Sequence, residues 1–104
     1  MNEYNGHRSW NAWNVSLWLG GDECHYDMAS NLIKHVKRNW KRNILSGEVL
    51  TKQKQMGIAT SMIFDHLNGR NFHHDLKHTK TPDGADFNRL SIRLWVDDMF
   101  DQID

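Results

Sequence analysis

The sequence predicts an all-α fold, a compact bundle of about four helices around a tryptophan-rich first helix. Three observations support this class. Residues 9–20 hold three of the five tryptophans in one segment that ends at a pair of glycines. Apolar residues in the later segments recur at spacings of three and four, which is the helical period. The chain also has a single proline and few alternating β-branched residues, which argues against a β fold.

Length and composition limit the classes of protein to which the chain can belong. The 104 residues suffice for one core of modest size, so we expect a single helical domain over residues 1–104. Thirteen Lys and Arg balance thirteen Asp and Glu, so the chain has no net charge that would indicate binding to nucleic acid or to a membrane. One cysteine, no signal-peptide pattern and no apolar run of membrane-spanning length predict a cytoplasmic protein without membrane contact.

The first expected helix begins after Ser9, a reasonable N-cap, and ends at Gly20 and Gly21. Its predicted core residues form or flank one face of the helical wheel: Trp10, Trp13, Leu17 and Trp18. Val15 and Leu19 lie on the opposite side, and a helix that is apolar almost all round is typically buried. We therefore expect this helix to be the centre of the core, with each buried tryptophan contributing roughly 2–4 kcal/mol.

Asn14 is the polar exception in this helix, because it lies between Trp10, Leu17 and Trp18. A buried amide must find hydrogen-bond partners. We expect it to bridge to a neighbouring backbone group, since most buried polar groups are satisfied within the protein, and contact with a ligand is the alternative.

A second helix is expected from Asp22 to about Trp40 or a little beyond, and the apolar period of this segment is the strongest in the chain. Opposite its apolar stripe lie the cations that we select as partner-binding residues: Lys34, Lys37, Arg38, Lys41 and Arg42. Such a face can hold phosphates or an acidic protein surface. A solvated face that keeps the protein soluble is the alternative.

A third helix is expected from Glu48 or Thr51 to Asn68. Its predicted core face consists of residues at helical spacing, namely Met56, Ala59, Ile63 and Leu67. Gly57 inside this helix costs up to about 1 kcal/mol relative to Ala, so a close helix contact is plausible there.

The fourth expected helix runs from Pro82 or Ala85 to Gln102 and carries two apolar stripes. One consists of Phe87, Leu90 and Leu94, and the other of Ile92, Val96, Met99 and Phe100. The helix ends in acidic residues that we select as a second partner-binding set: Asp97, Asp98 and Asp101. Acidic groups disfavour a helix C-terminus unless cations cover them, and the basic second helix could supply those cations within the chain or across a homodimer.

Residues 70–80 concentrate His73, His74 and His78 around Asp75. Two histidines at positions 74 and 78 would share a helical face, but no cysteine or established zinc pattern accompanies them, so we expect solvated loop residues and no metal. An enzyme would have to use these groups, or Cys24 with His25. Nothing supplies an oxyanion site, so we expect no catalytic activity and no cofactor.

Residues 4–26, YNGHRSWNAWNVSLWLGGDECHY, resemble the opening of an uncharacterised family of small phage and plasmid proteins. That family shares a Tyr-Asn-Gly start, a Trp-Asn-Val-x-Leu-Trp-Leu helix and an acidic turn. The matching positions are Tyr4, Asn5, Gly6, Trp13, Asn14, Val15, Leu17, Trp18, Leu19, Asp22 and Glu23. The final helix, LSIRLWVDDMF, is also similar to the end of such proteins. The resemblance implies a small cytoplasmic protein of a mobile element, and such proteins often bind and inhibit a host enzyme, a restriction system or a CRISPR effector.

Small size, opposite charged patches and this resemblance together favour an inhibitor that acts by stoichiometric binding to a host protein or ribonucleoprotein complex. The alternative is a nucleic-acid-binding module that uses the basic face of the second helix, with Tyr26 or Trp40 for stacking. Zero net charge and the lack of a recognisable reader motif weaken that alternative.

Overall fold

The computed structural model describes residues 9–42, 45–68 and 80–103. It contains four helices: α1 (Trp10–Gly21), α2 (Glu23–Asn39), α3 (Lys52–Leu67) and α4 (Arg89–Met99). Within these ranges the backbone forms isolated β-bridges but no strand, so the predicted all-α bundle is confirmed. None of the helices in the described part of the chain is long and apolar enough to cross a membrane.

Each helix begins after a side chain that caps its N-terminus. Ser9 and Asp22 accept hydrogen bonds from main-chain N–H groups three residues later, at the starts of α1 and α2. Thr51 and Asn88 do the same for α3 and α4. These oxygens satisfy N–H groups that have no acceptor inside the helix, which fixes where each helix starts. The predicted caps Ser9 and Asp22 are therefore confirmed.

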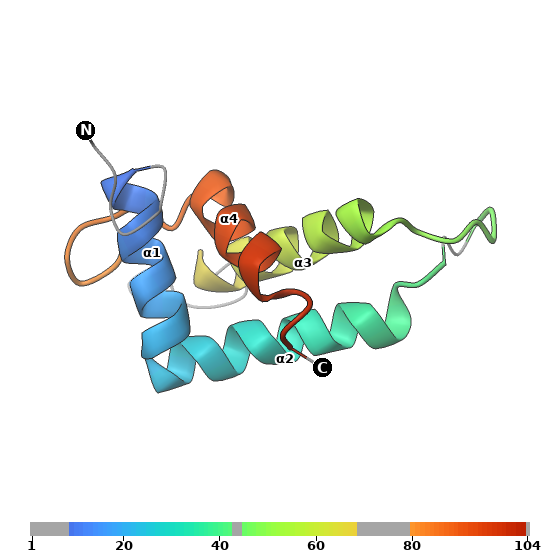
Figure 1. Cartoon of the computed structure of the whole chain (residues 1–104), viewed down its shortest axis with the longest axis horizontal. Coiled ribbons are helices and arrows are strands. Elements are labelled where there is room, and N and C mark those ends of the chain that lie inside the picture. The colour runs from blue at the N-terminus through green and yellow to red at the C-terminus, as the bar shows by residue number, and fades with distance from the viewer. Residues whose placement is uncertain (1–8, 43–44, 69–79, 104) are drawn as a thin grey trace.

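The helices form a ring of neighbours, in which α1 contacts α2 and α4 while α3 contacts the same two helices. Figure 1 shows α1 crossing one end of α2, α3 running back beside α2, and α4 between α1 and α3. One core joins all four helices. Its fully buried members include Val15 and Leu19 of α1, Ile33 of α2, Ile63 of α3 and Val96 of α4.

The predicted core face of α1 is wrong. Trp10 and Leu17 are 38% and 48% exposed, and Trp13 and Trp18 are only partly buried. The buried side carries Val15 and Leu19, together with Ala12 and Asn14. Both sides of this helix are apolar, so its sequence does not choose between them. Packing determines which side is buried, because the neighbouring helices α2 and α4 approach the side with the smaller residues.

The start and the stripes of the fourth helix also differ from the prediction. Residues 80–88 form a tight turn before α4, in which the N–H of Thr81 bonds to the carbonyl of Ala85 and Gly84 has a φ of 96°. That left-handed conformation stops a helix from starting at Pro82. Leu90 is 59% exposed, so its place in the first predicted stripe is wrong, whereas Phe87 of that stripe is buried but lies before the helix begins. Ile92 and Val96 of the second stripe are fully buried.

The predicted core face of α3 is confirmed, since all four of its residues, Met56, Ala59, Ile63 and Leu67, are buried. In α2 the helix ends at Asn39, so the prediction that Lys41 and Arg42 lie on its face is wrong. Trp40 is the C-cap of α2, and the chain then leaves the helix to form an antiparallel bridge between Arg42 and Val49.

Candidate functional site

The buried amide of Asn14 is satisfied by side chains rather than by the predicted backbone group. Its Nδ2 donates to Asp83 Oδ2 at 2.9 Å, and its Oδ1 accepts a hydrogen bond from the hydroxyl of Thr81. The indole Nε1 of Trp18 donates to the same Asp83 oxygen at 3.0 Å. These bonds fasten α1 to the turn before α4, so the polar residue in the tryptophan helix has a structural role.

The hydrogen bonds from Asn14 and then from Trp18 lower the pKa of the Asp83 carboxyl below its ordinary value. Both donors prefer the ionised carboxylate, which accepts both bonds without offering a proton of its own. The carboxyl group itself is exposed, and solvent reaches the outer side of this contact.

A second amide on α1, that of Asn11, binds the part of the chain that follows Asp83. Its Oδ1 accepts from the N–H of Asp86 at 2.7 Å, and its Nδ2 donates to the carbonyl of Asp86 and to Ser91 Oγ. The two amides of α1 therefore bind the 80–91 segment at two points. Neither is left for a ligand.

The cations selected on α2 divide into two groups. The Lys37 ammonium donates to the carbonyl of Ile103 and lies 4.8 Å from the centroid of the Phe100 ring. This lysine therefore holds the chain after α4 and is engaged within the molecule. Lys34 and Arg38 lie further round the helix, and neither forms an ion pair with another residue of the described ranges.

The acidic residues at the end of α4 are also partly engaged. Asp97 accepts from Arg93 Nε at 2.7 Å within α4, and Asp101 pairs with Lys52 at the start of α3. The structure thus pairs Asp101 with α3 and not with α2, which was the predicted source of cations. Asp98 remains exposed.

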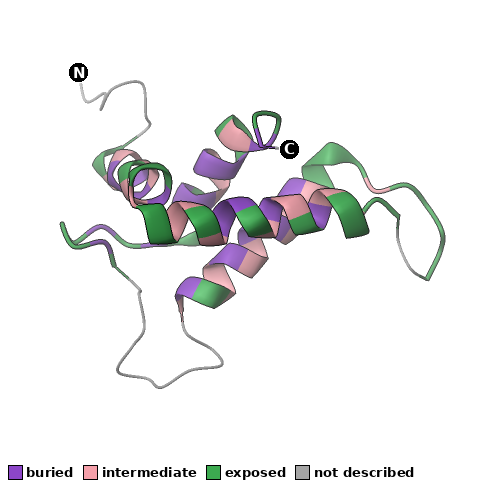
Figure 2. Cartoon of the chain, turned by 90° about the horizontal axis from the view of Figure 1, so that it is seen from below, coloured by how far each residue is buried: buried purple, intermediate pink, exposed green. Residues whose placement is uncertain are grey.

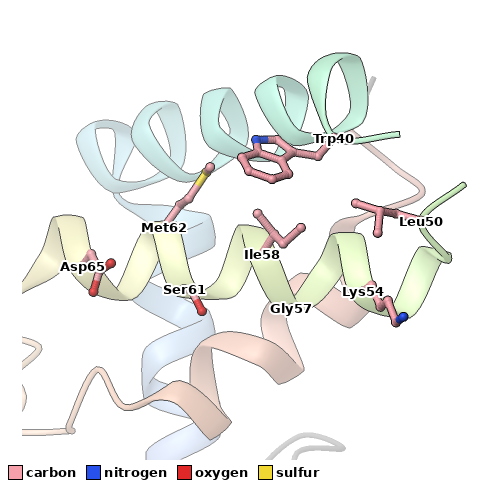
Figure 3. Close-up of a pocket in the computed structure, with 8 residues that line it drawn as sticks. All are labelled: Trp40, Leu50, Lys54, Gly57, Ile58, Ser61, Met62 and Asp65. Carbon is pink, nitrogen blue, oxygen red and sulfur yellow. The ribbon is translucent and has the colours of Figure 1, made fainter. Parts of the chain in front are cut away.

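An open groove of about 520 Å³ runs along the outer face of α3. Its lining residues on α3 repeat at helical spacing: Lys54, Gly57, Ile58, Ser61, Met62 and Asp65. Trp40 and Leu50 form its other wall (Figure 3). The middle of the groove is apolar, and its two ends carry opposite charges, which is typical of a surface that binds another molecule.

Two arginines of α4 border this groove on the side away from Trp40. Arg89 Nη1 donates to Ser61 Oγ at 2.8 Å, and its guanidinium lies 4.4 Å from the centroid of the Phe64 ring. Arg93 Nη1 lies 3.6 Å from the position that a Cβ on Gly57 would take. Cations from α3 and α4 thus border the apolar floor, and Asp65 borders it at the end opposite Lys54.

Exposed apolar residues continue from the groove into the connection between α2 and α3. Leu45 is 98% exposed and Val49 is 66% exposed, and Leu50 directly afterwards lines the groove. Figure 1 shows this connection extending beyond the ends of both helices, and Figure 2 shows its described part exposed over most of its length. We call Leu45 and Val49 the apolar tip.

This groove is not among the sites predicted from the sequence, and none of the five predicted cations of α2 and its continuation lines it. One signal was present. Ile58 and Met62 are four residues apart on α3 and lie outside the stripe that fills the core. A helix with apolar residues beyond its core stripe has surface that another element can cover.

The structure describes some of the cysteine, histidine and acidic groups that could serve in catalysis or metal binding. Cys24 is exposed, and His25 Nδ1 lies 2.9 Å from Asp22 Oδ2 beside a hollow of about 430 Å³ that His66 also lines. In the ranges that the structure describes, no three His, Cys, Asp or Glu residues converge on a metal-sized site. His73, His74, His78 and Asp75 lie outside the described residues.

Comparison with protein-family models gives a match. Residues 1–67 match the model of a family of unknown function, DUF7249. The match covers α1, α2 and α3 and therefore both apolar walls of the groove, but not α4. No curated protein and no solved structure matches the chain.

Proposed function

The chain belongs to the DUF7249 family of unknown function, and we propose that it is a small protein that binds a host protein stoichiometrically. The observation that carries the proposal is the groove along α3 with the apolar tip beside it. Together they leave a tryptophan, an isoleucine, a methionine and three further apolar side chains at one end of the molecule. Exposed apolar side chains gathered beside polar residues in this way are typical of a protein contact.

The composition of the groove fits a protein interface in its details. Trp40 is an aromatic residue held by α2 and half-buried, so it can offer contact area without losing much conformational freedom. Aromatic residues and arginine are enriched where interfaces gain most of their affinity. Met62 adds a flexible side chain that adapts to the shape of a partner.

The cellular context is the second part of the proposal. The resemblance of residues 4–26 to phage and plasmid proteins supports an accessory protein of a mobile element that acts in the host cytoplasm. Its target would then be a host enzyme or a defence complex such as a restriction system or a CRISPR effector. Blocking such a target needs an interface and no catalytic group.

The nucleic-acid-binding alternative has weaker geometric support. Of the five predicted cations, Lys37 is engaged with Ile103 and Lys41 and Arg42 lie beyond the helix end. Only Lys34 and Arg38 remain as exposed or half-exposed cations on α2 itself. Two cations give a small electrostatic contribution, because affinity for nucleic acid grows with the number of phosphates neutralised.

The test is an affinity capture from host lysate with the tagged protein, with and without nuclease. We expect a stoichiometric protein partner that survives nuclease and is lost with Met62→Glu in the groove. The matched control is Leu17→Glu, which places the same charge at an exposed residue of α1. Circular dichroism checks that both variants stay folded. A partner retained by Met62→Glu would contradict the groove, and a partner lost with nuclease or with Arg38→Glu would favour the nucleic-acid module.

A further inference from the structure

The charge around the groove indicates what kind of protein segment it accepts. Lys54 lines one end, and Arg89 borders the middle through its bond to Ser61. Neither Lys54 nor Arg89 forms an ion pair with a residue of the described ranges. Arg93 adds a third cation whose charge is shared with Asp97. A partner that brings carboxylates to this border would meet the positive charges of Lys54 and Arg89, which no carboxylate of the described ranges neutralises, while Asp65 places a negative charge at the other end of the lining.

The shape of the groove indicates a helical occupant. Its lining on α3 runs from Lys54 to Asp65 with spacings of three and four, so it is one straight stripe of a helix. At about 1.5 Å per residue the stripe is roughly 16 Å long, which matches about three turns of a second helix. The groove is open along its length, and Trp40 with Leu50 forms a wall on one side (Figure 3). A helix laid beside α3 would place apolar residues at positions three and four apart into it.

From these two features we infer that the groove binds an acidic amphipathic helix of the partner protein. Its apolar face lies on Ile58, Met62 and Trp40, and its carboxylates face Lys54 and Arg89. The inference rests on the proposed function and names the chemistry of the partner segment. Carboxylates along the edges of the helix would raise the rate of association and fix the register of docking.

Two other occupants fit the described surface less well. A second copy of this chain would have to offer the acidic end of α4, but Asp97 and Asp101 are already paired with Arg93 and Lys52. Single-stranded nucleic acid would need several stacking platforms, whereas Trp40 is the aromatic residue of the groove lining and the floor beside it consists of Ile58 and Met62, which have no ring. An acidic helix uses the apolar floor and the cationic border together.

The experiment uses the full chain with a benzophenone amino acid in place of Val49, an exposed residue next to the groove wall. After irradiation in host lysate, the crosslinked peptide is read by mass spectrometry. We expect a peptide of a host protein with more Asp and Glu than Lys and Arg, and with apolar residues three and four apart. The same probe in place of Leu17 on α1 is the positional control.

Charge reversal completes the test. Lys54 is the third residue of α3 after the cap Thr51, so Lys54→Glu creates a capping box and should not unfold the helix. Combined with Arg89→Glu, it should lower the crosslinking yield by about tenfold, whereas Lys34→Glu on α2 should leave it unchanged.

The outcomes separate the inference from the function. A neutral or basic partner peptide, a second copy of this chain, a nucleic acid, or a yield unaffected by the double reversal would overturn the acidic helix. In each of these cases the loss of a captured protein with Met62→Glu would still support the proposed function. Failure of Met62→Glu to release any protein would overturn the function and the inference together.

Discussion

Asn14 Nδ2 donates a hydrogen bond to Asp83 Oδ2 over 2.9 Å, although the two residues are 69 positions apart in the sequence. The bond joins the tryptophan helix to the turn before α4, and the hydroxyl of Thr81 binds the other end of the same amide. It explains how a polar residue can occupy a buried position of α1.

Removing the amide tests this explanation. Asn14→Ala should lower the free energy of unfolding by about 1–3 kcal/mol, because it leaves the Thr81 hydroxyl without its acceptor and opens a space beside it. Urea denaturation followed by tryptophan fluorescence measures the change. Ser16→Ala on the same helix should stay within about 0.5 kcal/mol, since this half-exposed residue makes no hydrogen bond of this kind. Equal effects of the two substitutions would contradict a special role for Asn14.

The lowered pKa of Asp83 makes this contact sensitive to acid. A carboxyl whose pKa is lower in the folded state adds stability above its unfolded pKa of about 3.9 and loses it as the pH falls toward the folded pKa. The melting temperature of the protein should therefore exceed that of Asp83→Asn at pH 7. The difference should shrink as the pH falls below about 4. A difference that does not change between pH 7 and pH 3 would show that the carboxylate charge is irrelevant.

The corrected core face of α1 predicts unequal costs of truncation along that helix. Leu19→Ala should destabilise by about 2–5 kcal/mol, because Leu19 is fully buried. Leu17→Ala, the same change at a 48% exposed residue, should cost less than about 1 kcal/mol. Thermal melts of the two variants provide the comparison. A larger loss of stability for Leu17→Ala than for Leu19→Ala would instead support the core face that the sequence predicts.

Lys37 should hold the end of the chain rather than bind a partner. Lys37→Met keeps the apolar stem but removes the bond to the Ile103 carbonyl and the contact with Phe100. We expect faster hydrogen exchange at the Ile103 N–H and a loss of about 1 kcal/mol in stability. Arg38→Met, one residue further, serves as the control and should change neither. Unaltered exchange in Lys37→Met would show that the lysine does not secure this segment.

Gly57 should be replaceable by alanine with a gain in stability. A Cβ at this position meets only Arg93 Nη1 at 3.6 Å, an ordinary contact distance, so the predicted close helix contact does not require glycine. Gly57→Ala should therefore raise the free energy of unfolding by about 0.5–1 kcal/mol, which chemical denaturation can measure. A destabilised variant would indicate that α3 packs more tightly here than the described contacts show.

Periodicity predicts the middle of this fold well. In α3 the stripe from Met56 to Leu67 is buried as expected, and in α2 Ile33 and Val36 fill the core. In both helices the core residues recur at spacings of three and four, so spacing identifies the buried face, although α3 also carries Ile58 and Met62 outside that face. The caps Ser9 and Asp22 follow from the same local chemistry.

Periodicity does not predict which face or contact is formed where residues distant in the sequence determine it. In α1 both sides are apolar, and the neighbours that bury Val15 instead of Trp10 come from other helices. The acceptor for Asn14 is Asp83, and no local pattern connects them. The groove escapes prediction for a similar reason, since it exists only when Trp40 of one helix end is placed over Ile58 and Met62 of the next helix.

The family match ends at residue 67, whereas the groups that bind Asn11 and Asn14 lie between residues 81 and 91. During synthesis on the ribosome, α1 is made before this segment, so its two amides lack these partners until residues 81–91 have been translated. The hydrogen bonds between α1 and the turn before α4 can therefore form only after these residues have been synthesised, although α1 can pack against α2 earlier. Closure of so long a loop slows folding and leaves the nascent helix open to chaperones and proteases in the meantime.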